Sequence, residues 1–415
     1  SDEYGYDYVV QPLPVSHFAA ILKGKNEVTL SWQAVTDSLE PTAKAEKYIV
    51  YTRIGDTDFD NGVVIKKNSY TCKIPSDQVV SFKITAINKG GESFPSEILS
   101  VGISSAAQTK PVLVVNGFNR ISAPDDFRSA DDEQAGFLAD QDNGVPYRNM
   151  ITYVGKMKEF RRVIPWTDDD SSGFGDSYGN YEKMVIAGNT FDYPALHGAA
   201  ILKAGCSFAS ASRDALTAKN ILNTDDYCAL DLILGKQKQS KMGRGGITPL
   251  KFKTFDAEMQ QAITHYCQAG GRVFVSGSYV GTDLWQNPLA LANKEDQEFA
   301  QRILKYKWRN NKAALEGNIR YVASPLTVEQ LHFTYYNKPN EDSYAVESPD
   351  AIDPADACTY TAFRYTENNL SAGIVFGGNE SDRWRTVILG FPFEAVTDSA
   401  DRDVLMQKIL QYLLK

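Results

Sequence analysis

Apolar and polar residues alternate along the first part of the chain, in short segments separated by turn-forming residues. The alternating segments have apolar residues two apart, and they cover residues 28–32, 48–52, 70–74 and 81–87. A period of two is typical of strands with one buried face. Stretches rich in Gly, Asp and Asn lie between them, at 56–62 and 89–91. The pattern predicts a β-sandwich over residues 14–106, preceded by a tail or linker over 1–13.

The pattern changes after a linker at residues 104–109. Short runs that are apolar on both faces follow, and they cover residues 111–115, 184–187, 229–234 and 272–275. Such runs are typical of parallel strands covered by helices. Phe255, Met259 and Ile263 recur at helical spacing, with Thr254 as the expected N-cap. We therefore predict a three-layer α/β/α domain with a mostly parallel sheet over residues 107–415.

The last part of the chain predicts additions to this sheet. Alternation over 361–365 and 372–376 favours antiparallel strands, and an apolar strand is expected over 386–390. A closing helix is expected over 402–414. The predicted architecture is flavodoxin-like or Rossmann-like.

The predicted sandwich resembles a fibronectin type III domain. The residues that carry the resemblance are 28–32, 48–53 and 86–96. Val80 stands where that family has the tyrosine of its tyrosine corner. Trp32 closes an alternating strand, so we expect it in the core. The resemblance implies a spacer or adhesion unit, and no chemistry is assigned to this domain.

The second domain resembles the class I glutamine amidotransferase-like superfamily. Residues 269–278 resemble its strand and nucleophile elbow, and residues 387–394 resemble a late strand that carries a His-Glu pair. The elbow position holds Ser278 or a neighbour in place of cysteine, and residues 391–394 have no histidine where the base would stand. A serine without a base is a weak nucleophile, so amidotransferase chemistry is not expected.

A narrower resemblance points to a compartment. Residues 188–208 are similar to a segment of large secreted bacterial proteins labelled xanthan lyase-like or N-acetylmuramoyl-L-alanine amidase-like. The resemblance implies a secreted, periplasmic or cell-surface protein and a separate catalytic domain outside this chain. The first residue is Ser1, so a processed or truncated piece is expected.

Composition narrows the classes of partner. The 415 residues carry a formal net charge of -9, which disfavours a nucleic-acid partner. No apolar run reaches the length of a membrane span. The basic cluster at 236–244 is expected to be a solvated loop. With 4 His and 5 Cys in no ligand-like spacing, neither a metal nor a cofactor is expected, and a Cys206–Cys228 bridge stays open.

Ligands of open parallel sheets bind at the carboxyl ends of the strands, so the polar residues that follow each predicted strand form the candidate site. Candidate catalytic residues are Ser278 as nucleophile, His197 as base and Asp192 or Asp283 as the group that orients it. Trp166 flanks an acidic loop over 168–180 and is a candidate stacking residue. The candidate substrate-binding residues are Asn116, Asn119, Asn189, Tyr193, Asp283 and Trp166.

Three functions remain open from the sequence. The first is a non-catalytic or degenerate module that recognises polysaccharide or peptidoglycan fragments at the carboxyl ends of the sheet. The second is a serine-dependent hydrolase of ester or amide bonds that uses Ser278 and His197. The third is a structural spacer for a missing catalytic domain.

Overall fold

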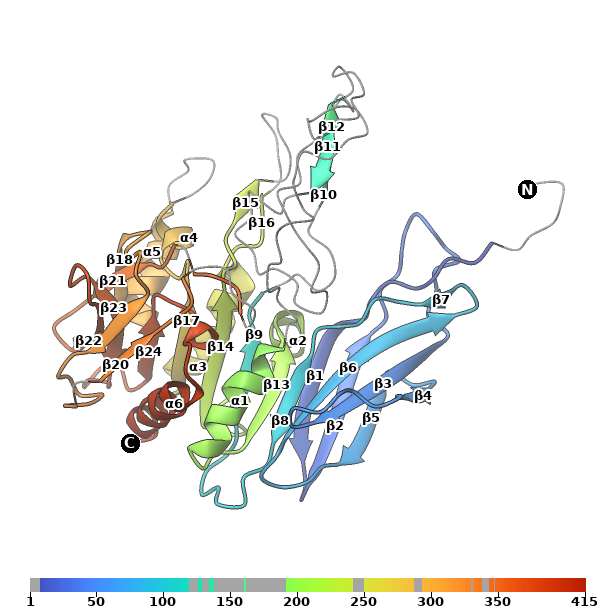
Figure 1. Ribbon diagram of the computed structural model, residues 1–415, viewed down its shortest axis with the longest axis horizontal. Helices are drawn as coiled ribbons and strands as arrows, with labels where there is room; N and C mark the ends of the chain where they lie inside the picture. Colours follow the sequence, from blue (N-terminus) through green and yellow to red (C-terminus); the bar gives the residue numbers. More distant parts are fainter. Residues whose placement is uncertain are drawn as a thin grey trace. The chain divides into compact units, whose positions relative to one another are not determined.

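The computed structural model describes most of the chain, with gaps. The described residues are 8–118, 126–128, 134–137, 160–161, 192–241, 250–286, 293–329, 331–337, 343–346 and 348–415. The chain forms two compact units (Figure 1). The first consists of Ser1–Asn116 and Phe191–Cys228, and the second of Gly117–Thr190 and Ala229–Lys415.

The first unit contains the predicted sandwich. One sheet pairs β1, β2 and β5, and the other pairs β4, β3, β6 and β8, with β7 beside β6. The bounds are β1 (Ser16–Lys23), β2 (Glu27–Gln33), β3 (Lys47–Ile54), β4 (Val63–Ile65), β5 (Ser69–Lys73), β6 (Val79–Asn88), β7 (Gly91–Glu92) and β8 (Leu99–Gly102). Trp32 lies in the core with 1% of its surface exposed, as predicted. This is the strand pairing of an immunoglobulin-like sandwich.

The same unit continues beyond the predicted sandwich. Strand β9 (Val112–Asn116) pairs in parallel with β13 (Phe208–Ser212), and β13 also pairs with β1 and β8 of the sandwich. Helices α1 (Tyr193–Lys203) and α2 (Arg213–Lys219) flank β13 and pack on the sandwich strands. The compact unit therefore includes residues that the sequence division at 106 assigned to the α/β part.

Side-chain hydroxyls join β8 to β13. The Ser210 hydroxyl accepts from Ser100 N at 3.0 Å and donates to Ser100 O at 2.6 Å. The Ser207 hydroxyl accepts from Ser104 N at 3.0 Å. Buried backbone groups need partners, and here serine side chains supply them where the backbone ladder is short.

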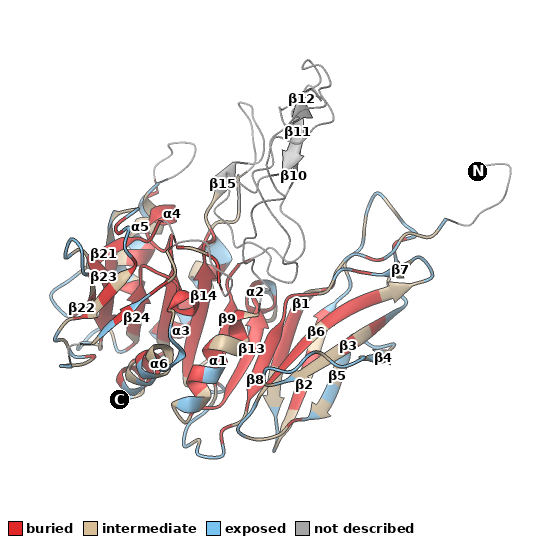
Figure 2. Cartoon of the chain, viewed as in Figure 1, coloured by how far each residue is buried: buried red, intermediate tan, exposed pale blue. Residues whose placement is uncertain are grey.

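The second unit is built on a mixed sheet. Strands β14 (Ala229–Gly235), β17 (Arg272–Gly277) and β24 (Arg385–Leu389) are parallel neighbours, and all three are buried almost throughout (Figure 2). The sheet continues antiparallel through β23 (Ser371–Phe376), β22 (Thr359–Tyr365), β19 (Asn318–Tyr321) and β20 (His332–Thr334). The expected antiparallel strands are confirmed. The sheet was expected to be mostly parallel, but it is mixed.

Helices α3 (Ala257–Gln268) and α6 (Ser399–Leu413) pack against the parallel strands. The side chain of Asp256 caps α3 by accepting from Met259 N, so the expected N-cap at Thr254 is wrong by two positions. The remaining elements are β10 (Asp126–Arg128), β11 (Gln134–Phe137), β12 (Phe160–Arg161), β15 (Ser240–Lys241), β16 (Leu250–Lys251), α4 (Thr282–Trp285), α5 (Lys294–Phe299), the π-helix η2 (Ala300–Leu304), β18 (Tyr306–Asn310), β21 (Ala351–Pro354) and the 3-10 helix η3 (Phe393–Ala395).

Candidate functional site

The carboxyl ends of β14, β17 and β24 hold the predicted nucleophile. Ser278 follows β17, and its backbone N donates to Gly235 O at 2.8 Å, which fixes it beside the end of β14. Ser278 is 1% exposed, and its hydroxyl has no hydrogen-bond partner among the described residues. A buried hydroxyl without a hydrogen-bonded base is not activated for attack.

The turn after Ser278 is held by a buried carboxylate from another part of the chain. Asp350 accepts hydrogen bonds from Gly281 N and Thr282 N at 2.8 Å each, and from Thr282 Oγ1 at 2.5 Å. Trp308 Nε1 and Asn311 Nδ2 donate to it at 3.2 and 3.0 Å. Burial raises the pKa of Asp350 to about 6, while these donors act in the opposite direction. Asp350 thus fixes the backbone at the end of the turn.

Asp283 fixes the same turn from inside. Its carboxylate accepts from Gln239 N at 2.9 Å and from Thr254 N at 2.8 Å. Asp283 is 1% exposed, and burial raises its pKa to about 7. The side chain expected to bind substrate or orient the base is engaged with backbone amides, and its functional role stays a prediction.

Glu394 contacts a tyrosine that the sequence did not single out, and a lysine lies beside that tyrosine. Tyr344 donates its hydroxyl to Glu394 Oε1 at 2.5 Å, and Lys236 Nζ lies 5.8 Å from the centre of the Tyr344 ring. Lys236 is 9% exposed and Glu394 is 1% exposed. The expectation of a solvated loop is therefore wrong for Lys236. The sequence did hold a sign that Lys236 is buried at this edge, because it directly follows the apolar run of β14.

The other described candidates lie in the first unit. Asn116 ends β9, opposite Ser212 in the register, and is fully buried. Burial raises the pKa of the Glu97 carboxyl well above its usual range, the charge of Asp214 adds to this shift, and Asn116 acts in the opposite direction. Tyr193 is also buried, at 3% exposure.

The predicted base and its orienting group also belong to the first unit. His197 is fully buried in α1. Asp192 binds Arg53 of β3 through both carboxylate oxygens, at 2.7 Å each. Ser278 belongs to the second unit, so the proposed Ser278–His197–Asp192 set draws on both units and stays a prediction. Asn119, Trp166 and Asn189, and the loop over 168–180, lie outside the described residues.

Several further expectations can be set against the described residues. The five cysteines all lie in the described residues, and no disulfide joins any two of them, Cys206 and Cys228 included. In the described part of the chain, no group of three or more His, Cys, Asp or Glu side chains is arranged to hold a metal ion. No described helix is long and apolar enough to cross a membrane.

Comparison with known proteins gives matches to solved structures alone. No protein-family model matches the chain, and no curated protein matches it. The twitchin kinase region from C. elegans is 19% identical over 27% of this chain and 19% of that chain, with a TM-score of 0.22. Domains A168–A170 of titin are 22% identical over 21% of this chain and 30% of that chain, with a TM-score of 0.19. Each of these two matches covers less than a third of this chain and less than a third of the matched chain.

A single-domain structure is also similar. The human domain described as the "forth FNIII domain" is 17% identical over 25% of this chain and 88% of that chain, with a TM-score of 0.22. Fibronectin type III domains are named in the descriptions of several of these structures.

Proposed function

We propose that this chain is a non-catalytic recognition module of a secreted bacterial protein, and that it binds polysaccharide or peptidoglycan fragments. The proposed binding edge is formed by the carboxyl ends of β14, β17 and β24. The observation that carries the proposal is the turn from Ser278 to Asp283, which Asp350 and Asp283 fix through hydrogen bonds to backbone amides.

A fixed turn favours recognition because a preorganised surface loses little conformational entropy on binding. The acidic groups at this edge are engaged in holding structure: Asp350 and Asp283 bind backbone amides, and Glu394 accepts from Tyr344. Groups with such fixed partners are suited to maintaining a shape. A general acid or base must instead exchange protons with substrate.

The architecture supports a modular role. The first unit has the pairing of an immunoglobulin-like sandwich, and such domains commonly serve as spacers or adhesion units. The parallel strands β14, β17 and β24 support the resemblance of the second unit to a flavodoxin-like, glutamine amidotransferase-like domain. In that case Ser278 and Glu394 are remnants of a catalytic site. A catalytic domain outside this chain would act on the bound ligand.

Binding measurements with the intact chain test the proposal. We expect isothermal titration calorimetry to show saturable binding to soluble polysaccharides or muropeptides, with no change in the ligand after prolonged incubation. Lys238 lies 5.2 Å from the Tyr279 ring in the strand-end region, so Lys238→Ala should weaken binding several-fold. Lys67→Ala, at an exposed position of the sandwich, removes the same charge and should leave binding unchanged.

The alternative function is a serine hydrolase. Its motive is the position of Ser278, buried at a tight turn directly after a parallel strand. It predicts hydrolysis of activated esters such as p-nitrophenyl acetate that is lost in both Ser278→Ala and His197→Ala. Such a loss, with folding preserved by circular dichroism, would replace the recognition proposal. Absence of both binding and hydrolysis would favour the third reading, a structural spacer.

A further inference from the structure

The second unit has a cavity at the amino ends of its parallel strands β17 and β24, at the other end of these strands from the proposed recognition edge. The cavity has a volume of about 680 Å³, within the range of ligand sites. It is lined by residues 268–270, which precede β17, and by Arg383 and Trp384, which precede β24. The π-helix η2 contributes Gln301 and Arg302. None of these residues takes part in the proposed recognition edge.

The floor of the cavity is a buried lysine in an uncommon backbone conformation. Lys305 is 5% exposed and has a φ of 73°, in the left-handed region that residues with a Cβ rarely adopt. It follows directly after η2, and π-helical turns are rare and occur frequently at functional sites. Strain of this kind persists only where the surrounding structure holds it in place.

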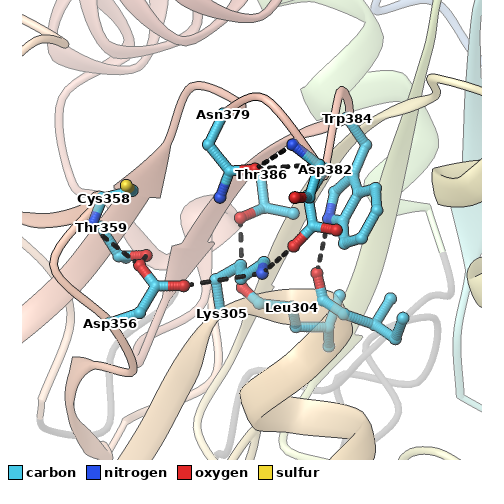
Figure 3. A network of polar contacts seen from close by, with 11 residues as sticks. Leu304, Lys305, Asp356, Cys358, Thr359, Asn379, Asp382, Trp384 and Thr386 are labelled. Carbon is cyan, nitrogen blue, oxygen red and sulfur yellow. Dashed lines mark hydrogen bonds and ion pairs between the residues drawn. The ribbon is translucent and has the colours of Figure 1, made fainter.

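The charge of Lys305 is matched within the floor (Figure 3). Its Nζ lies 2.5 Å from an oxygen of Asp382 and 3.5 Å from one of Asp356. The ammonium also lies 5.2 Å from the centre of the Trp384 ring, and the Trp384 indole N–H donates to Ile303 O at 2.8 Å. Asp356 is held in turn by Thr359 Oγ1 at 2.8 Å. Both carboxylates of the cavity lining, Asp356 and Asp382, thus contact the same ammonium group.

Among the described residues, two guanidinium groups that line the cavity have no ion pair of the kind that Lys305 makes. Within the described part of the chain, Arg302 and Arg383 make no ion pair and no side-chain hydrogen bond. A guanidinium group presents several N–H donors in a planar fork that matches carboxylate, sulfate and phosphate oxygens. The charged side chains that line the cavity are three cations and two carboxylates, so the two arginines give the lining a net positive charge, which favours an anion.

We propose that this cavity is a binding site for a small ligand that carries an oxyanion group, held by Arg302 and Arg383 above the Lys305–Asp382 floor. The site is independent of the proposed recognition edge, because the two lie at opposite ends of the same strands and share no residue. The shared chemistry of its ligands is a carboxylate, sulfate or phosphate group.

Calorimetry with simple anions tests this site. The intact chain is titrated separately with malonate, sulfate and inorganic phosphate, and with malonamide as a neutral analogue of malonate. We expect at least one anion to bind, malonamide not to bind, and affinity to fall as the NaCl concentration rises. The most tightly bound anion identifies the oxyanion class. The absence of binding by all three anions, or equal binding of malonate and malonamide, would overturn the proposal.

Variants then locate the site. The Arg302→Ala/Arg383→Ala double variant should lose at least about tenfold in affinity, which corresponds to about 1.4 kcal/mol. Arg383→Lys keeps the charge but lacks the planar fork, so its affinity should be intermediate. Arg309→Ala is the matched control, because Arg309 is 56% exposed and does not line the cavity. Unchanged affinity in the double variant would contradict the assignment. Since all these positions are exposed, the variants should fold.

Discussion

The two ends of the parallel strands in the second unit use charge in opposite ways. At the carboxyl ends, Asp283 and Asp350 are buried and bind backbone amides. At the amino ends, Asp356 and Asp382 bind Lys305, and arginines line an open cavity. Buried carboxylates thus fix the shape of one edge, whereas at the other edge two carboxylates contact the same lysine and the arginines stay available for a ligand.

Removal of the Asp350 carboxylate should have the largest effect on the stability of the second unit. Asp350→Ala leaves buried backbone and side-chain donors without an acceptor, and each orphaned donor costs about 1–3 kcal/mol. We expect a loss of about 5 kcal/mol in the free energy of unfolding, measured by urea denaturation. Asp353→Ala removes an exposed carboxylate paired with Arg309 and should cost less than about 1 kcal/mol. Equal losses would show that Asp350 does not hold the turn.

The free energy of unfolding should depend on pH through the buried Asp283 carboxyl. Burial raises the pKa of Asp283 from 3.8 to about 7, so the folded state binds this proton more tightly than the unfolded state. The stabilising contribution is complete below pH 3.8 and is lost as the pH rises to about 7, by on the order of 4 kcal/mol. Asp283→Asn cannot titrate, so its free energy of unfolding should change less than that of the parent between pH 4 and 8. Parallel pH profiles for the two proteins would contradict the shift.

At the amino ends, Lys305→Met removes the cation between Asp356 and Asp382 while preserving most of the side-chain volume. The lysine side chain is 6% exposed, and its loss leaves the Asp382 carboxylate, 29% exposed, without a countercharge. We expect a loss of about 2 kcal/mol in the free energy of unfolding. Lys408→Met breaks a pair with Glu329, which is 62% exposed, and should cost less than about 1 kcal/mol. The reverse order of losses would rule out Lys305 as the structural floor.

The smallest effect is expected at Ser278. Its buried hydroxyl has no partner among the described residues, so Ser278→Ala removes a polar group whose burial is uncompensated. The melting temperature should stay the same or rise slightly. Asp256→Ala, which removes the N-cap of α3, should instead lower the free energy of unfolding by about 1 kcal/mol. A large loss in Ser278→Ala would reveal a partner for the hydroxyl.

The spacing of apolar residues predicted those strands and helices whose own sequence repeats with a period of a strand or a helix. Strands β2, β3, β5, β6, β14 and β17 and helix α3 lie close to their expected positions, and the strand expected over 184–187 lies outside the described residues. Strand β13 was missed because its sequence, FASAS, consists mainly of small residues and shows no apolar alternation, although all of it is buried. Its strand character comes from pairing with β9, β1 and β8, which is a tertiary effect.

The site was less predictable than the fold. Ser278 was found because it directly follows an apolar strand, and the same rule pointed to Asn116. Asp350 lies 69 residues from Gly281 along the chain, in a segment without a motif, so no local pattern joins the two. The left-handed backbone of Lys305 had no sequence signal either, because glycine is the residue that marks such positions.

The hydroxyl contacts between Ser100 and Ser210 have a consequence for the biosynthesis of the protein. These residues are 110 positions apart, so a ribosome must release the whole intervening stretch before β13 can cover the edges of β1 and β8. Until then, the nascent sandwich presents unpaired strand edges, which are templates for aggregation. A recombinant fragment cut at residue 106 would keep those edges permanently, whereas one ending after Cys228 would include the segment that covers them.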